Sequence, residues 1–174
     1  MRFPLLSSLF ALLVLLLGLG PAGAQTVELI GEAGKWSAFT FLEEGKTVCY
    51  MTSEPEKSEG NYKVRGQVYA LVTHRPALDS HDVVSLVAGY PLKPDADILL
   101  TIDRKQTFKL FGAKETAWAP DDKTDRALVQ AMVKGSAMVI EGTSSRGTKT
   151  KDTYSLTGFG KMYQAINQAC GIRG

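Results

Sequence analysis

The segment GTSSRGTK, from Gly142 to Lys149, is the part of the sequence most similar to a ligand-binding motif. It nearly matches the phosphate-binding pattern G-x-x-x-x-G-K-[ST], in which glycine-rich backbone surrounds the phosphates and the lysine contacts them. Here Thr148 precedes Lys149, so the lysine and the hydroxyl stand in the opposite order. The next residues, KDTYSL, alternate as in a strand, whereas a phosphate loop must open a helix. We therefore expect no nucleotide site here.

A serine nucleophile would need a nearby base, and the sequence offers few candidates. Ser144 and Ser145 lie in GTSSRG, which is not the G-x-S-x-G of a nucleophile elbow, and they lie between two expected strands. The two histidines, His74 and His81, both fall in THRPALDSHD, which we interpret as one polar loop. We expect a non-enzymatic protein, and the alternative is a hydrolase whose histidine and serine meet through folding.

The clustered carboxylates have simpler structural explanations than metal binding. Asp79 and Asp82 flank His81, but the spacing matches no recognised set of metal ligands. Asp121 and Asp122 are typical of the acidic start of a helix. The sequence therefore predicts neither a metal site nor any other cofactor.

The region around GTSSRGTK does predict a basic, hydroxyl-rich turn. AMVIEG and DTYSLTG are expected to pair as strands, and the loop from Thr143 to Lys151 would then project from the sheet. Arg146, Lys149 and Lys151 in this loop form a candidate binding site for an acidic protein or an anionic glycan. A solvated turn without a partner is the simpler interpretation.

The beginning of the chain predicts export. Arg2 precedes an apolar run from Leu9 to Leu19, which is followed by the sequence GPAGA. This order is typical of a secretory signal peptide, residues 1–24, cleaved after Ala24. An uncleaved anchor is the alternative, but the apolar run is short for a membrane span of about 20 residues.

Cleavage would leave a single domain of ordinary size. Removal of 24 residues from a chain of 174 leaves 150, residues 25–174, and lowers the formal charge from +2 to +1. So small a charge gives no electrostatic basis for nucleic-acid binding. No later segment is expected to insert stably into a membrane.

Cys49 and Cys170 lie 121 positions apart in the mature part of the chain. An exported chain with an even number of cysteines most simply pairs them. A bridge closing a loop of this length contributes about 5 kcal/mol of stability in the chain-entropy model. Free thiols or a metal pair are the alternatives, although two cysteines without clustered histidines make a poor zinc site.

The elements that must position these residues are mostly short strands. YKVRGQVYALV, residues 62–72, alternates with period two, and WSAFTFLE and TVCYMTS flank a short turn at residues 44–46. DVVSLVAGY, ADILLTID, QTFKLF and SAMVIEG are further strand candidates, with a hairpin turn at residues 103–106. Short strands with turn signals about every 8–12 residues predict an antiparallel β-sandwich or a barrel-like domain.

Two helices are expected within this mainly β fold. PDDKTDRALVQAMVKG has an acidic start and ends on lysine and glycine, both of which favour a helix. GFGKMYQAINQACG, the C-terminal helix, places an apolar stripe on one face, including Phe159, Ile166 and Cys170. If Cys49 lies on an early strand, a bridge would pin this helix to the N-terminal part of the sheet.

The closing segment, GTSSRGTKTKDTYSLTGFGKMYQAINQAC, resembles the C-terminal signature of the invasion-associated locus B family. The similar features are its S-x-R-G-T turn, its D-T-Y-S-L-x-G-F strand and its I-x-x-x-C ending. Trp36, Cys49 and the segments VAGYPLKPDADILLTIDRKQTFKLF and TAWAPDDKTDRALVQAMVKGSAMVIEG fit the same pattern, so the resemblance covers essentially the whole mature chain. It implies that the two family cysteines map onto Cys49 and Cys170, and it brings no catalytic residues.

The resemblance also implies a small, mostly β protein of a Gram-negative envelope, periplasmic or secreted, linked in some members to entry into host cells or survival there. Together with the residues, it predicts a non-enzymatic module that binds an envelope or host protein or an anionic glycan. A periplasmic hydrolase and a structural or stress-protective envelope factor are the alternatives.

Overall fold

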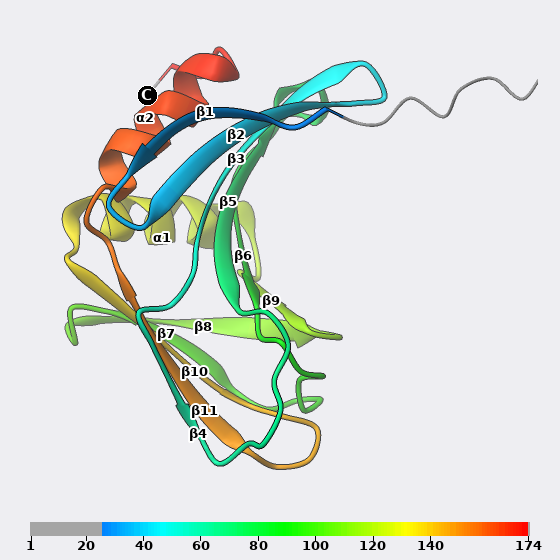
Figure 1. The fold of residues 1–174 in the computed structure, drawn as a ribbon, viewed down its shortest axis with the longest axis vertical. Helices are drawn as coiled ribbons and strands as arrows, with labels where there is room; N and C mark the ends of the chain where they lie inside the picture. The colour runs from blue at the N-terminus through cyan, green and yellow to red at the C-terminus, as the bar shows by residue number, and fades with distance from the viewer. Residues whose placement is uncertain (1–25, 174) are drawn as a thin grey trace, which may run out of the picture.

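The computed structural model describes residues 26–173, so the predicted signal peptide, residues 1–24, lies outside the described part of the chain (Figure 1). The strands are β1 (Glu28–Ala33), β2 (Trp36–Glu43), β3 (Lys46–Ser53), β4 (Lys57–Gly60), β5 (Tyr69–Arg75), β6 (Ser80–Val87), β7 (Ile98–Ile102), β8 (Gln106–Ala113), β9 (Thr116–Trp118), β10 (Ala137–Thr143) and β11 (Lys149–Ser155). The helices are a short 3₁₀ helix η1 (Pro76–Leu78), α1 (Asp122–Lys134) and α2 (Phe159–Ala169). Within residues 26–173, neither α1 nor α2 has the length and apolar character needed to cross a bilayer.

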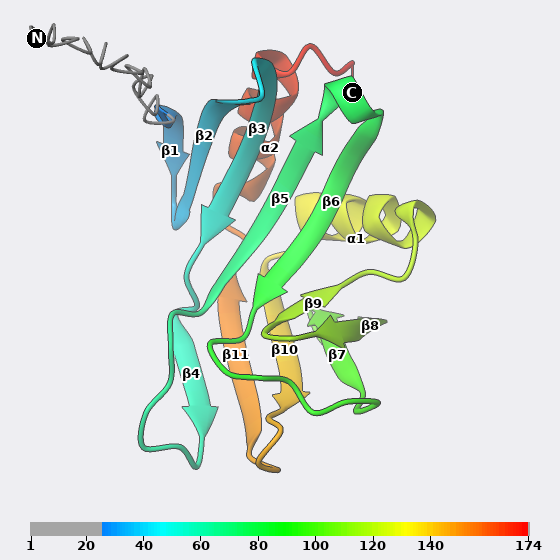
Figure 2. The same ribbon diagram turned by 90° about the vertical axis from the view of Figure 1, so that its right-hand side faces the viewer.

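All eleven strands form one antiparallel sheet, in the order β1-β2-β3-β5-β6-β9-β8-β7-β10-β11-β4. The two end strands, β1 and β4, do not pair with each other in the described part of the chain, so the sheet is open (Figure 2). The prediction of a mainly β, antiparallel domain with packed helices, one of them C-terminal, is confirmed. The question of closure is also answered, because the sheet does not close into a barrel.

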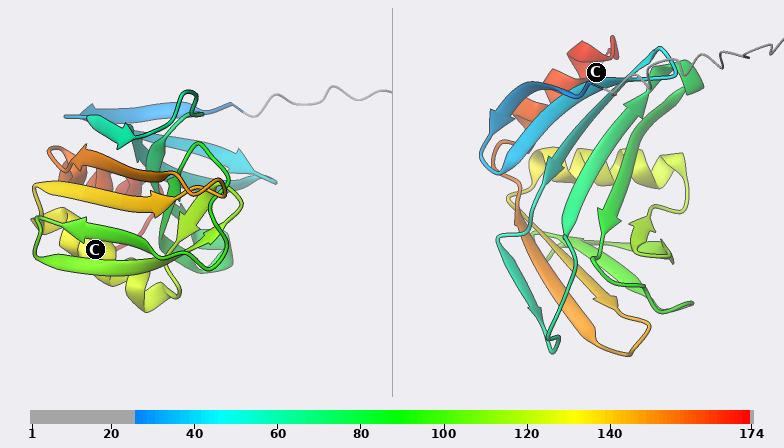
Figure 3. Two further views of the ribbon diagram at one scale, coloured as in Figure 1. Left: turned by 90° about the horizontal axis from the view of Figure 1, so that it is seen from below. Right: turned by 45° about the vertical axis from the view of Figure 1, so that its right-hand side comes forward.

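Strand β8 connects two halves of the sheet that meet at an angle (Figure 3). Its residues 106–110 pair with β7, and its residues 111–113 pair with β9. In the half that runs from β1 to β9, α2 packs against β1, β2 and β3, while α1 packs against β6. Both helices cover the same face of this half, and within residues 26–173 its other face carries no helix (Figure 1).

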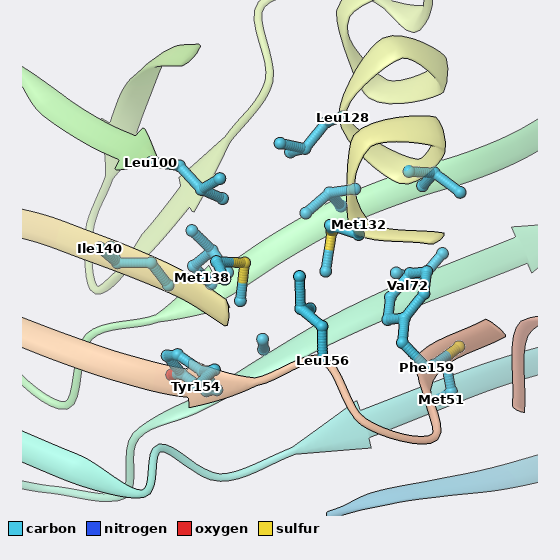
Figure 4. Close-up of a cluster of buried hydrophobic side chains, with 14 of the residues drawn as sticks. Met51, Val72, Leu100, Leu128, Met132, Met138, Ile140, Tyr154, Leu156 and Phe159 are labelled. Atoms are coloured by element: carbon cyan, nitrogen blue, oxygen red, sulfur yellow. The ribbon is translucent and has the colours of Figure 1, made fainter. Parts of the chain in front are cut away.

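The hydrophobic core lies where the helices and both halves of the sheet meet (Figure 4). Met51 and Val72 from the first half, Leu128 and Met132 from α1, and Met138 from the second half are fully buried in one cluster. In β5, buried residues alternate with half-buried ones, as expected for a strand with one face on the core. Each such side chain contributes about 1.5–3 kcal/mol on burial, so this cluster holds the two halves and the helices together.

Several local predictions are confirmed because they depend on neighbouring residues alone. The β2–β3 hairpin turns at Glu44 and Gly45, with φ of 52° and 76°, and the β7–β8 hairpin turns at Asp103 and Arg104, with φ of 49° and 57°. Asp121 caps α1, since its carboxylate accepts a hydrogen bond at 2.7 Å from the third following backbone N–H. The acidic start predicted for this helix therefore has a direct structural role.

The glycine of the LTGF segment is required by close packing of two backbones. Gly158 has a φ of +89°, and a side chain there would overlap the Ala33 carbonyl in the turn between β1 and β2. Gly34 in that turn has a φ of +59°, and a side chain on it would overlap the Thr157 carbonyl. Next to this contact, the Trp36 indole N–H donates to a backbone carbonyl of β11 at 2.9 Å. The start of α2 is thereby fixed against the first hairpin.

The prediction of a strand over residues 62–72 is wrong for its first seven residues, because β5 begins only at residue 69. The Arg65 guanidinium holds this segment as a loop: its two terminal nitrogens donate to the Asp152 carboxylate at 2.8 and 2.6 Å. The guanidinium also lies 5.4 Å from the Tyr62 ring centroid and 5.0 Å from that of Tyr90. Both side chains of the ion pair are only 5% exposed, so alternation alone could not reveal that this arginine points inward.

Candidate functional site

The basic turn that the sequence indicates is shorter than predicted. β10 and β11 pair as far as Lys149, so Lys149 and Lys151 lie on strand β11 and only Arg146 lies in the turn. All three side chains are exposed, and Lys151 Nζ lies 4.0 Å from a carboxylate oxygen of Glu141. The three charges are spread along a hairpin and do not surround a hollow, and their role in binding stays a prediction.

His74 is fully buried in β5, so the interpretation of THRPALDSHD as one polar loop is wrong. Its Nδ1 accepts a hydrogen bond at 3.0 Å from the backbone N–H of Asp82, which leaves the ring proton on Nε2. Burial lowers the pKa of His74, and the Asp82 carboxylate opposes this effect only in part. His74 is therefore a neutral side chain beneath α2, held by its hydrogen bond to the backbone, and its role is in packing.

The second histidine and the serines are not assembled into a catalytic site in the described residues. His81 Nε2 lies 3.3 Å from Asp79 Oδ1 at the surface. Ser144 is buried, and its hydroxyl accepts a hydrogen bond from the Thr148 N–H at 3.1 Å, which closes the basic turn. Nor do residues 26–173 contain a group of three His, Cys, Asp or Glu side chains placed to hold a metal ion.

Cys49 and Cys170 form the predicted disulfide, with their Cα atoms 6.0 Å apart. Cys49 is buried in β3 opposite His74 of β5, and Cys170 directly follows α2. On the same helix, the Tyr163 hydroxyl donates to Asp82 Oδ1 of β6 at 2.8 Å. These two links fasten α2 to the sheet. The face of the sheet that α2 covers is therefore held in a fixed position against the helix.

The opposite face of β2, β3 and β5 carries an open groove of about 1010 Å³. Its lining residues alternate along the strands with core residues such as Ala38, Met51 and Val72, so they point away from the helices. We call this feature the outer-face groove. Its apolar lining consists of Val27, Phe39, Phe41, Tyr50, Pro55, Tyr69 and Leu71.

Three aromatic rings form the middle of the outer-face groove. Phe39 and Tyr50 face each other across β2 and β3, and their rings stack with centroids 5.1 Å apart and planes 18° apart. Phe41 meets Tyr50 edge to face, with centroids 5.9 Å apart. Partial burial raises the pKa of Tyr50, so its hydroxyl stays protonated and able to donate at neutral pH. A cluster of aromatic side chains left half-buried on one sheet face is typical of an interaction surface.

The two ends of the outer-face groove differ in charge. At one end Arg75 is neutralised by Glu43, with Nε to Oε2 at 3.0 Å, and this hydrogen bond lowers the pKa of Glu43. At the other end lie Lys35, Glu54 and Glu56, and within residues 26–173 no ion pair involves any of the three. This second end therefore carries more negative than positive charge.

Sequence analysis missed the outer-face groove, although one signal of it was available. The segment AFTFL of β2 is apolar on both faces, whereas a strand with one solvated face alternates apolar and polar residues. The partners of β2 in the groove come from β3 and β5, and only the register of the folded sheet brings them together. None of the predicted site residues lines the outer-face groove.

Comparisons with known proteins agree on one family. The family profile described as "Invasion associated locus B (IalB) protein" matches residues 36–167. The crystal structure of invasion associated protein B from Bartonella henselae superimposes with a TM-score of 0.56 at 20% sequence identity, covering 80% of this chain and 95% of that chain. A search of curated proteins finds no match. The structural likeness concerns the fold, and the profile match covers most of the described residues.

Proposed function

Because the chain belongs to the invasion-associated locus B family, we propose that it is an exported envelope protein that acts by binding another protein in the outer-face groove, without catalysing a reaction. The observation that carries this proposal is the aromatic cluster of Phe39, Phe41 and Tyr50 on a sheet face that no helix covers. Such a surface favours a partner that buries it.

A protein partner fits the groove better than an anionic glycan does. The unpaired charges at its end are mainly carboxylates, Glu54 and Glu56, which repel sulfate or uronate groups. The basic side chains of β11 and its turn do not line the groove. A glycan on Arg146, Lys149 and Lys151 would therefore occupy a separate surface.

The non-enzymatic part of the proposal is supported by the histidines. His74 is buried beneath α2 and hydrogen-bonded to backbone, and neither histidine lines the outer-face groove. No observation favours the hydrolase alternative over binding. Export is supported by the signal sequence and by the long-range disulfide, which needs an oxidising compartment. A link to host invasion is an expectation that the family name suggests.

Site-specific photocrosslinking in living bacteria tests the proposal. Benzoylphenylalanine replaces Phe39 in the groove or, as a matched control, Phe111, an exposed aromatic residue on β8 outside the groove. We expect a discrete protein adduct from position 39 and none from position 111, and we expect Tyr50→Ala to abolish the adduct. Equal adducts at both positions, or adducts at 39 that are insensitive to Tyr50→Ala, would contradict the proposal. Thermal melts of each variant exclude loss of folding as the cause.

A further inference from the structure

We infer that the outer-face groove accepts an extended peptide segment of about six residues, with apolar side chains in its middle and a lysine or arginine at the end next to Glu54 and Glu56. This inference depends on the proposed function, because it specifies the partner that the groove would bind. Three features of the groove carry it: its dimensions, the state of its strand backbones, and the distribution of its charges.

The dimensions follow from the strands. Along β2 and the turn residue before it, the lining runs from Lys35 to Phe41, and six residue steps of about 3.3 Å give a length of about 20 Å. Across the sheet the lining runs from β2 to β5, which are two strand spacings, or about 10 Å, apart. An extended hexapeptide has the same length of about 20 Å, whereas a helix with its side chains is about 10–12 Å wide and would lie above the groove.

The backbone groups of the groove are already paired, so recognition must come from side chains. β2 pairs with β1 and β3, and β3 pairs with β2 and β5, which leaves no free strand edge in the groove for strand addition. The middle of the groove instead offers an apolar floor: Phe39 lies opposite Tyr50, and Leu71 of β5 lies diagonally across from Tyr50. Two apolar side chains on the same side of an extended peptide, at alternate positions, would reach this floor.

The net negative charge at the end of the groove next to Glu54 and Glu56, the acidic end, favours a cation. Glu54 and Glu56 line this end, and Glu32 lies beside it, since its carboxylate accepts a hydrogen bond from the Ser37 hydroxyl at 2.9 Å. Lys35 supplies the one opposing charge among these four side chains. The far end is neutral, because Arg75 is paired with Glu43. A basic side chain of the peptide is therefore favoured at the acidic end only, which would also set its direction.

An array of randomised hexapeptides, acetylated and amidated so that only side chains carry charge, tests the inference with the exported, oxidised protein. Hexapeptides are too short to bind as stable helices. We expect enrichment of sequences with two alternate apolar residues and one terminal lysine or arginine. For the best peptide, Glu54→Lys combined with Glu56→Lys should weaken binding about tenfold, as measured by titration calorimetry. The matched control is Glu115→Lys, which reverses an exposed charge in the β8–β9 turn and should leave the affinity unchanged.

Each result has a distinct meaning. Enrichment of basic peptides that switches to acidic peptides in the double variant supports the inference. Peptides that bind equally well to the wild type and to the double variant, but are lost with Tyr50→Ala, overturn the inference and leave the proposed function in place. If the array shows no binding that Tyr50→Ala removes, the inference is wrong, and the crosslinking experiment then decides independently whether the groove binds a folded partner.

Discussion

Several ionisable side chains in this protein have structural roles, and three of them are buried at positions where their charge matters. Asp125 of α1 accepts a hydrogen bond at 2.9 Å from the backbone N–H of Val84, which ties the helix to β6. Arg65 and Asp152 form the buried ion pair that holds the loop before β5. Both arrangements make stability depend on protonation or on an intact partner, and each leads to a measurable prediction.

The free energy of unfolding should depend on pH because the Asp125 carboxyl changes its protonation state. Burial, assisted by Asp122, Asp82 and Asp121, raises the pKa of Asp125 from 3.8 to about 6. The folded state therefore binds this proton more tightly than the unfolded state, so this group adds stability as the pH falls from above 6 towards 3.8. Asp125→Asn stays neutral and keeps the acceptor, so at pH 8 it should be more stable than wild type by about 2 kcal/mol.

Urea unfolding at pH 8 and at pH 4.5 measures this effect. The advantage of Asp125→Asn should shrink at the lower pH, where the wild-type carboxyl becomes neutral in the folded state. Asp125→Ala is the control: it is neutral like asparagine but removes the acceptor of the buried Val84 N–H, so it should be less stable than Asp125→Asn by about 1–3 kcal/mol at both pH values. An asparagine variant no more stable than wild type at pH 8 would show that the carboxylate is not penalised by burial.

Breaking the Arg65–Asp152 pair should be far more costly than replacing it. Arg65→Met leaves a buried carboxylate without its partner, and we expect a loss of about 3–5 kcal/mol in the free energy of unfolding. The double variant Arg65→Met with Asp152→Leu should recover at least half of that loss, because no charge stays buried. Lys151→Met, which removes an exposed cation 4.0 Å from its partner, is the control and should change stability little. Equal losses in the single and double variants would show that the pair contributes mainly through its contacts with the tyrosine rings.

At the scale of elements, the C-terminal helix is attached at both ends. Its start lies against the β1–β2 turn through the facing glycines Gly34 and Gly158, and its end is linked to β3 by the disulfide. Between these points the Tyr163 hydroxyl donates to Asp82 at 2.8 Å. Because α2 covers β1, β2 and β3, it supports from behind the strands that carry the outer-face groove.

Removal of the disulfide should therefore affect α2 first. The bridge links residues 121 positions apart, and its loss in Cys49→Ser with Cys170→Ser should cost up to about 5 kcal/mol in the chain-entropy model. Native-state hydrogen exchange should show a larger drop in protection for α2 than for α1, which contains neither cysteine. Equal drops in both helices would indicate that the bridge stabilises the molecule only globally. The groove variants should be measured in the oxidised protein, since its supporting strands depend on this helix.

At the scale of the whole molecule, the fold separates a covered face from an exposed one. The helices and the disulfide lie on one side of β2, β3 and β5, and the outer-face groove lies on the other (Figure 1). Residues that maintain the fold are thus distinct from residues available to a partner. Surface substitutions such as Tyr50→Ala can therefore test binding without disturbing the core.

The proposed export and the formation of the disulfide also concern the whole molecule, because they determine where the chain begins and whether its two cysteines are oxidised. Intact-mass spectrometry of protein isolated from the periplasm or the medium should give a chain beginning at Gln25, two hydrogens lighter than the reduced form. A variant that lacks residues 1–24 and stays in the reducing cytoplasm should contain free thiols and unfold at lower denaturant concentration. A native protein with its leader attached, or with both thiols reduced, would contradict the assigned compartment.

Features that depend on neighbouring residues or on simple counting could be predicted from the sequence alone. The hairpin turns at Glu44 and Asp103 and the capped start of α1 follow from turn and capping chemistry that acts over a few positions. The disulfide was predicted from two cysteines in a chain whose beginning predicts export. The family signature could likewise be recognised because it consists of consecutive residues.

Which polar side chains are buried and which apolar ones are exposed depends instead on long-range packing, which the sequence does not reveal. His74 and Arg65 look like surface residues in the sequence. In the structure, α2 covers His74, and Arg65 is buried because it pairs with Asp152, 87 positions further along the chain. The outer-face groove joins residues of three strands whose register is set by long-range pairing. Alternation shows that a strand has two faces, but the placement of the helices determines which face is solvent-exposed, and that placement is a property of the whole chain.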